Sequence, residues 1–349
     1  MGILFKLNID VFAQSILQAL ISEETLSLVG IMLLVLYLGN LLQTSGNFKK
    51  MVESLENLIP EPRLILALPP SFIGLLPMIG GALMSAPIVA EAAKKWNISS
   101  AWKTFLNYWF RHIWEYCWPL YLNLIIAAAI VQVPIIKIAS VQFPFTLLAA
   151  CLGMIMLFKY VPRLPKERRD GKFSGNLFNL FFSIWPIVLI ILLVFIFKLS
   201  MLLALTMVVL LTQLFFRMNF QNRIKVIWKS LSIKMIVLMV SIMVFKRILE
   251  ISSALDSITQ AVHSEGLSGM FLLFIIPFFL GLLTGVNQAF VSISFPLLIP
   301  IFGQGNPDMV LVMFAYVSGF VGILLSPAHL CLALTVEYFQ ADIRDVYKI

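Results

Sequence analysis

Apolar residues in this chain form long uninterrupted runs. They do not alternate as in the strands of a soluble protein, nor do they recur every three or four residues as in its amphipathic helices. About 20 apolar residues in a helix cross the hydrocarbon core of a bilayer. The runs therefore predict spans near 25–44, 110–131, 140–158, 176–197, 200–217 and 232–249, and a broken span near 309–336. Pro, Gly and polar residues interrupt two further apolar segments, 63–93 and 267–303, which predicts hairpins that enter and leave on one side. The first 21 residues predict an amphipathic surface helix without the cleavage site of a signal peptide.

The composition supports the same class of protein. Of the 349 residues, 60% are hydrophobic and 12% are charged, and the mean hydropathy is +0.98, whereas about a quarter of a soluble domain is charged. We therefore expect an all-α integral membrane protein that crosses the plasma (inner) membrane several times. Cys117, Cys151 and Cys331 lie in apolar segments without paired spacing, so neither a disulfide framework nor a structural zinc site is expected.

Lys and Arg sort to one side of the membrane if both interrupted segments are hairpins. Twenty of the 25 cationic residues then share one side, and the positive-inside rule makes that side cytoplasmic, together with the C-terminus. Topology thus explains the net charge of +8, and no nucleic-acid partner is expected. Lys246 and Arg247 fall on the opposite side, where we interpret them as interface anchors.

The two hairpin segments resemble each other. The stretch "PSFIGLL" (70–76) recurs as "PFFLGLL" (277–283), 207 positions later, and after one inserted residue Pro119 matches Pro327 at an offset of 208. Three predicted spans lie between the copies, so the second copy is expected to lie upside down in the membrane. Inverted repeats with broken helices that meet near the midplane are the architecture of secondary transporters.

The repeat predicts five parts of the chain, of which two belong to a mobile transport domain. They are 1–62, a surface helix and scaffold span; 63–131, hairpin 1 and the first broken span; 132–231, three linking spans; 232–266, a scaffold span and second surface helix; and 267–349, hairpin 2 and the second broken span. The transport domain comprises the second and fifth parts.

Non-helical backbone at membrane depth must be buried in protein or line a wet cavity, so the hairpin turns predict an internal binding site. The expected substrate-binding residues are Gly80, Gly81, Ser85, Thr284, Asn287, Gln288, Ser292, Ser294 and His329. Small residues such as Ala82 and Ala289 are better explained by tight helix packing. Neither hairpin turn carries Asp or Glu, so Na⁺, the one cofactor considered, would be held by carbonyl and hydroxyl oxygens.

Each hairpin is followed by a span that a proline interrupts, and we expect Pro119 and Pro327 to act as hinges. Before the first break, Arg111, His112 and Glu115 share one helical turn, and Arg111 and Glu115 can pair. Two interpretations remain open. The aromatic neighbours suit an interface belt with a snorkelling arginine, whereas a gate would use Arg111 for the substrate's negative charge and His112 or Glu115 for a coupling proton.

Three motifs carry a resemblance to a known family: "LLPMIGGALMSAP" (75–87), "NYWFRHIWEYCWPLY" (107–121) and "LLSPAHLCLALTVEYF" (324–339). The chain resembles a prokaryotic membrane family catalogued as domain of unknown function 401, grouped with the ion transporter superfamily. Better-known relatives in that superfamily move carboxylates and other anions or export arsenite. The resemblance implies a homodimer in which a transport domain moves like an elevator against a scaffold. It also implies that members begin with a further hydrophobic helix, and we expect this sequence to start after it.

We therefore expect a secondary transporter of a small anionic solute, coupled to Na⁺ or H⁺, and not an enzyme. The alternatives are a channel or lipid flippase on the same inverted frame. An intramembrane enzyme with a metal at His112, Glu115 and His329 is disfavoured, because these residues lack the HExxH spacing that puts two imidazoles on one helix face.

Overall fold

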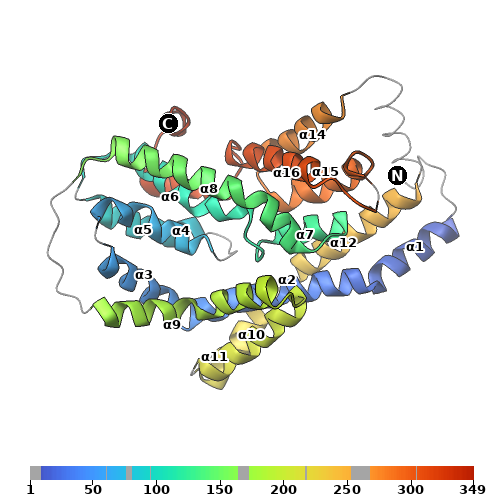
Figure 1. Cartoon of the computed structure of the whole chain (residues 1–349), viewed down its shortest axis with the longest axis horizontal. Helices are drawn as coiled ribbons and strands as arrows, with labels where there is room; N and C mark the ends of the chain where they lie inside the picture. Colours follow the sequence, from blue (N-terminus) through green and yellow to red (C-terminus); the bar gives the residue numbers. More distant parts are fainter. Residues whose placement is uncertain are drawn as a thin grey trace. The chain divides into compact units, whose positions relative to one another are not determined.

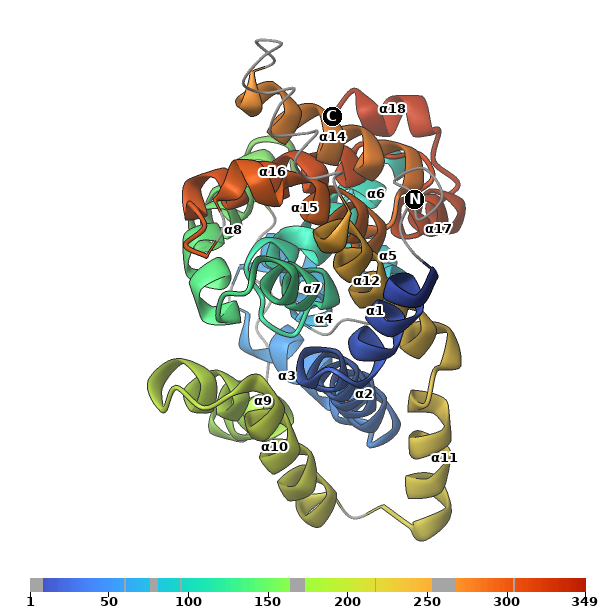
Figure 2. The same cartoon turned by 90° about the vertical axis from the view of Figure 1, so that its right-hand side faces the viewer.

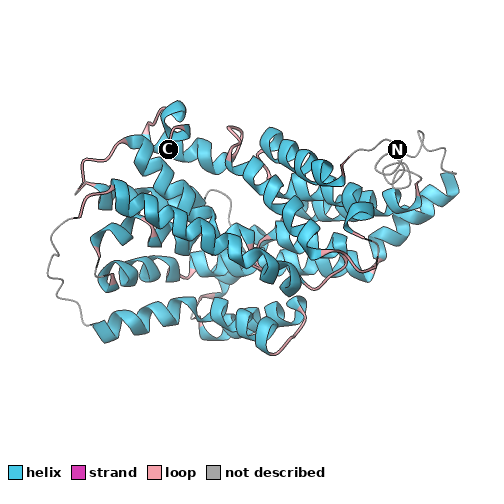
Figure 3. Cartoon of the chain, turned by 45° about the horizontal axis from the view of Figure 1, so that its top comes forward, coloured by secondary structure: helices cyan, strands magenta, loops and turns pink. Residues whose placement is uncertain are grey.

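Helices account for all regular secondary structure in the part of the chain that the structure describes (Figure 3). The computed structural model describes residues 9–59, 61–75, 81–94, 96–163, 173–216, 218–252, 268–303 and 305–349. The expected all-α fold is confirmed over these residues. Gly80, Lys6 and the second predicted surface helix, within 253–267, lie outside them.

The chain forms two compact units, each assembled from three separate segments. Unit 1 contains Met1–Leu33, Tyr121–Phe143 and Ser232–His329; unit 2 contains Leu34–Leu120, Pro144–Leu231 and Leu330–Ile349. Two of the boundaries fall just after Pro119 and Pro327. Each predicted hinge therefore marks a point where the chain leaves one unit for the other.

Unit 1 is built around the second hairpin. Its helices are α1 (Ile9–Ile21), α7 (Leu122–Val131), α12 (Ile233–Ile251), α14 (Gly269–Thr284), α15 (Asn287–Phe302) and α16 (Met309–Leu324). Helices α14 and α15 form the hairpin, α16 packs against both, and α15 also packs against α7 (Figures 1 and 2). The turn between α14 and α15 uses Gly285 at φ +62°, a backbone conformation that favours glycine. Helix α16 begins where Asp308 accepts a hydrogen bond from Val310 N at 2.8 Å.

Unit 2 is built around the first hairpin. Its helices are α3 (Asn47–Leu58), η1 (Pro62–Leu66), α4 (Leu68–Ile73), α5 (Gly81–Ala93), α6 (Ser100–His112), η2 (Ile113–Tyr116), α9 (Phe173–Ile191), η3 (Leu192–Ile196), α10 (Met201–Phe215), α11 (Phe220–Ser230), α17 (Leu330–Phe339) and α18 (Ile343–Tyr347). Helix α5 packs against α4, α6 and α17, and α3 packs against α9. The unit boundaries divide α2 (Glu23–Thr44) and α8 (Ile135–Tyr160) between the two units.

Four helical stretches among the described residues are long and apolar enough to cross a membrane: Glu23–Thr44, Ile135–Tyr160, Gly175–Ile196 and Phe220–Ile251. The first three coincide with predicted spans, and the fourth, which joins α11 and α12, contains the span predicted at 232–249. Helix α10 has 15 residues, fewer than the span predicted at 200–217. These apolar helices are compatible with a membrane-embedded α-helical protein.

The first broken span differs from its prediction in where it begins. The sequence predicts a start near residue 110, but α6 begins at Ser100, because the Ser99 hydroxyl caps it by accepting a hydrogen bond from Trp102 N at 3.3 Å. The polar residues Lys103, Thr104 and Asn107 lower the hydropathy of these first turns, so hydropathy alone does not predict them as part of the span. The breaks themselves lie where prolines predict them, between η2 and α7 and between α16 and α17.

Lys246 corrects another expectation, since the sequence suggests that it anchors α12 at a membrane surface. The residue is 3% exposed. Its Nζ donates to Ala129 O at 3.2 Å and to Glu24 Oε2 at 3.4 Å. The carbonyl end of α7 carries partial negative charge, and together with Glu24 it favours an ammonium group there. Lys246 therefore ties α12 to α7 and α2 inside unit 1.

Candidate functional site

The turn of the second hairpin is held by the break in the second broken span. His329 Nδ1 lies 2.7 Å from Gly285 O, and the Ser326 hydroxyl donates to Leu282 O at 2.6 Å. A Cβ on Gly285 would lie 2.6 Å from His329 N, so no larger residue fits this approach. Because a carbonyl only accepts hydrogen bonds, Nδ1 of His329 carries a proton and donates to Gly285 O.

The predicted hydroxyl residues of hairpin 2 bond to their own helices. The Thr284 hydroxyl donates to Leu280 O and the Ser294 hydroxyl to Phe290 O, both at 2.6 Å, and Ser292 donates to Gln288 O. Their hydrogens are thus committed to the backbone, while their oxygens keep lone pairs for a further donor or a cation. Asn287 and Gln288 form the first turn of α15.

In unit 2, the predicted residues of hairpin 1 lie in the first turn of α5. Gly81 is buried and begins the helix. Ser85 is fully buried, and its hydroxyl donates to Ala82 O at 3.2 Å. The structure thus places both on the start of α5, whereas Gly80 lies outside the described residues.

Arg111, His112 and Glu115 form a buried charged cluster at the end of α6. Arg111 Nη1 lies 3.0 Å from Glu115 Oε1, and the two side chains are 3% and 4% exposed. The predicted pairing is confirmed, and the burial shows that Arg111 does not snorkel to an interface. His112 Nδ1 lies 2.6 Å from Tyr108 O, which assigns the proton to Nδ1. Its Nε2 lies 3.8 Å from Glu115 Oε1, the same oxygen that binds Arg111.

Glycines bring each hairpin close to the helix before the break. A Cβ on Gly74 would overlap Arg111 O, and the Trp114 indole donates to Ser71 Oγ at 3.0 Å beside it. The hairpin of unit 1 shows the same kind of approach. A Cβ on Gly281 would overlap Gly319 O, and one on Gly322 would overlap Phe278 O. Backbone contact at these points requires glycine, because any side chain would force the helices apart.

Sequence reasoning missed several buried polar residues beside these contacts. Thr104, Asn107 and Thr335 in unit 2 are fully buried. In unit 1, Asn123 is 1% exposed and its amide donates to Tyr316 Oη at 2.5 Å. The spacing of Thr104, Asn107 and Arg111 on one face of α6 is the signal that could have found two of them.

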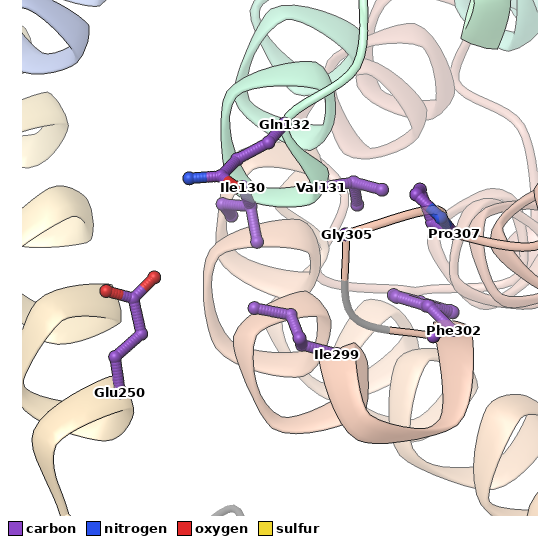
Figure 4. Close-up of a pocket in the computed structure, with 9 residues that line it drawn as sticks. Ile130, Val131, Gln132, Glu250, Ile299, Phe302, Gly305 and Pro307 are labelled. Carbon is purple, nitrogen blue, oxygen red and sulfur yellow. The ribbon is translucent and has the colours of Figure 1, made fainter.

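Unit 1 also has a pocket of about 290 Å³ at the ends of α7, α12 and α15. Figure 4 shows Glu250 from α12 and Gln132 from the end of α7 beside Ile299 and Phe302 of α15. None of the predicted site residues lines this pocket. In each unit, the candidate site residues are instead the buried polar residues near the break of the helix.

An all-helical chain with apolar helices of membrane-spanning length, interrupted helices and buried charged groups is consistent with an α-helical membrane protein. A family model described as protein of unknown function (DUF401) matches residues 2–349, and the chain belongs to that family. The resemblance noted from three motifs is thereby confirmed at the family level. A comparison with curated proteins gave no match.

Proposed function

We propose that this protein is a secondary active transporter that moves a small anionic solute, such as a carboxylate, and couples its movement to Na⁺ or H⁺. The observation that carries the proposal is a duplicated contact. Gly74 of hairpin 1 meets the carbonyl of Arg111, and Gly281 of hairpin 2 meets the carbonyl of Gly319. The glycines differ by 207 positions and the carbonyls by 208, which are the two offsets of the sequence repeat.

A second pair of contacts follows the same register. Ser71 meets Trp114 in unit 2, and Phe278 meets Gly322 in unit 1. Ser71 and Trp114 meet through their side chains, and Phe278 and Gly322 through their backbones, so this second pair matches in position only. Similarity between apolar sequences arises easily by chance, whereas contacts at the repeat offsets favour a common arrangement of helices. These contacts support a structural repeat, and the three spans predicted between the copies would invert the second one. Inverted repeats with interrupted helices are typical of secondary transporters.

The way the halves of the broken spans pack also supports a repeat. In unit 2, hairpin 1 packs against α17, the second half of the second broken span. In unit 1, hairpin 2 packs against α7, the second half of the first broken span. Each hairpin thus packs against the second half of the broken span that belongs to the other repeat: hairpin 1 against α17, and hairpin 2 against α7. We propose that the hairpins and broken spans form a transport domain with an elevator-type motion.

The charged cluster at the end of α6 offers a gate for an anion. Arg111 and His112 both face Glu115 Oε1, at 3.0 and 3.8 Å. If His112 Nε2 gains a proton, the imidazolium becomes a second cation beside Glu115 Oε1. The two cations then compete for the same carboxylate oxygen, which weakens the ion pair between Glu115 and Arg111. The guanidinium could then bind a carboxylate of the solute through two parallel hydrogen bonds.

We propose that the protein lies in the plasma membrane as a homodimer, with its C-terminus in the cytoplasm. The sorting of 20 of 25 cationic residues to one side supports this orientation. The dimer is supported by the family resemblance alone.

Uptake into proteoliposomes tests the function. With a panel of labelled carboxylates, an imposed Na⁺ or proton gradient should drive accumulation above the external concentration of one of them. Arg111→Lys should reduce that uptake at least tenfold, because Lys keeps the charge but loses the two-pronged geometry. Arg247→Lys, at a half-exposed site outside the cluster, should transport normally. Flux that only equilibrates the solute would indicate a channel instead.

A further inference from the structure

Two fully buried oxygen atoms on α6 accept no hydrogen bond from any described residue. They are Thr104 Oγ1 and Asn107 Oδ1, and both residues are 0% exposed. A spacing of three residues places them on the same face of the helix. A buried polar atom without a partner typically costs about 1–3 kcal/mol, so two on one face call for an explanation.

The hydrogen-bond partners of Asn107 fix the direction of its amide. Asn107 Nδ2 donates to Ala82 O at 3.0 Å and to Thr335 Oγ1 at 3.4 Å. Ala82 O is a carbonyl and can only accept, so the NH₂ group must face α5. The Oδ1 atom therefore points away from these partners with both lone pairs unused by the described residues.

Thr104 is unusual among the buried and partly buried helical threonines of this chain because its hydroxyl has no partner among the described residues. Thr25 donates to Ala19 O at 2.6 Å and Thr146 to Cys117 Sγ at 3.1 Å. Thr206, Thr212, Thr284 and Thr335 each donate to the carbonyl four residues earlier, at 2.6 or 2.7 Å. Such back-bonding satisfies the hydroxyl inside an apolar helix. Thr104 makes no such bond to a described residue. Its buried oxygen therefore lacks a partner among the described residues, on the same face of α6 as Asn107.

The other copy of the proposed repeat shows that packing does not require these polar groups. At the repeat offset of 208, Thr104 corresponds to Val312, Asn107 to Ala315 and Thr335 to Ala127. All three apolar counterparts are also 0% exposed. Apolar side chains thus fill the same buried positions in unit 1. Ligand binding therefore explains the polar residues Thr104, Asn107 and Thr335 in unit 2 better than packing does.

We propose that Thr104 Oγ1 and Asn107 Oδ1 contribute to a binding site for a monovalent alkali cation, with Na⁺ as the probe ion. This inference rests on the proposed function, in which the cation would be the coupling ion. Neutral oxygen atoms suit a hard cation, whereas divalent ions require carboxylates. Helix α6 carries no carboxylate, and Glu115 in the following η2 is paired with Arg111. Neither Thr104 nor Asn107 titrates, so the site does not bind a proton.

Thermal unfolding of the detergent-purified protein tests the site without any transport assay. The midpoint should rise with NaCl relative to choline chloride at equal ionic strength, because a ligand that binds only the folded state stabilises it. Thr104→Val keeps the shape of the side chain but removes its oxygen. The Na⁺ concentration that gives half of the maximal rise in midpoint should therefore increase by about tenfold or more. Asn107→Leu should do the same, and Thr104→Ser, which restores a hydroxyl, should respond as the natural protein does.

Two control variants separate loss of the site from loss of stability. Thr212→Val removes a buried hydroxyl that bonds to its own helix, and Gln142→Met removes another buried amide, whose Nε2 donates to Met313 O at 3.5 Å. Both should lower the midpoint in choline while the response to Na⁺ stays unchanged. An unchanged Na⁺ response in Thr104→Val and Asn107→Leu would overturn the site.

The outcome is distinguishable from that of the proposed function. If Na⁺ gives no shift in the natural protein while a proton gradient drives uptake, the site is wrong and the transporter stands. If Na⁺ binds through Thr104 but no carboxylate is accumulated, the site stands and the proposed function is wrong.

Discussion

Arg111 and Glu115 show how a pair of charges can persist in an apolar setting. Both side chains are almost fully buried, and their 3.0 Å contact replaces the hydration that each loses. Desolvation offsets much of the attraction in such a pair. The pair therefore contributes little net stability while both charges are present, and it becomes costly when only one remains. This asymmetry suits the proposed gate, because a competing anion could replace Glu115 as the partner of Arg111, and a proton could change the charge that faces Glu115.

The first prediction concerns this pair. Arg111→Met leaves Glu115 as a buried uncompensated charge and should destabilise the protein by about 3–5 kcal/mol. Adding Glu115→Leu should recover most of that loss, because no unpaired charge then remains. The measurement is denaturant unfolding of the single and double variants in detergent. A double variant that is as unstable as Arg111→Met would show that shape, and not charge, governs this position.

At the scale of helices, glycines set how closely each hairpin approaches the helix before the break. Gly281 faces Gly319 O across the contact between α14 and α16, and Gly74 faces Arg111 O across the contact between α4 and α6. In lipid, such close backbone contact replaces the hydrophobic effect as the source of attraction between helices. The hairpins are therefore positioned by backbone shape as much as by side chains.

The second prediction tests this contact. Gly281→Ala introduces a methyl group that overlaps a backbone carbonyl, and such overpacking should cost about 1–3 kcal/mol. Gly39→Ala in α2 is the matched control, since its Cβ would meet nothing within 4 Å and alanine favours the helix by up to about 1 kcal/mol. Thermal unfolding in detergent compares the two. Equal midpoints for both variants would contradict a tight contact at Gly281.

At the scale of the whole molecule, the transporter proposal requires that both hairpins re-enter the membrane from opposite sides. The charge sorting along the chain depends on the same condition. If either hairpin crossed completely, every later loop would change sides, and the repeat would no longer be inverted in the required way. Membrane topology is therefore the most direct whole-molecule test.

The third prediction follows from that topology. In a background without Cys117, Cys151 and Cys331, single cysteines at Ser268 and Gly305 should react with an impermeant thiol reagent from the same side of the membrane. Cysteines at Glu61 and Lys94, which flank hairpin 1, should both react from the opposite side. Labelling of cells and of inverted vesicles provides the comparison. If the two ends of one hairpin react from different sides, that segment is a full span and the inverted repeat is lost.

The sequence by itself determined the positions of most helices and both breaks. Apolar run length predicts a span because a lipid-facing helix must be apolar over its whole length. Proline predicts a break because it lacks an N–H and clashes with the preceding turn. Both causes act within a few residues, so local sequence is sufficient. The i, i+4 pairing of Arg111 and Glu115 is local in the same sense.

The tertiary structure alone decided which buried polar residues meet. Asn107 and Thr335 are 228 positions apart, and Lys246 and Glu24 are 222 apart. A helix that is apolar on most sides does not reveal which face meets protein, because lipid and protein interior are equally apolar. Without that information, the sequence assigned no role to Asn107 and suggested that Lys246 is an interface anchor. Packing between distant segments brought them into the interior and gave them their partners.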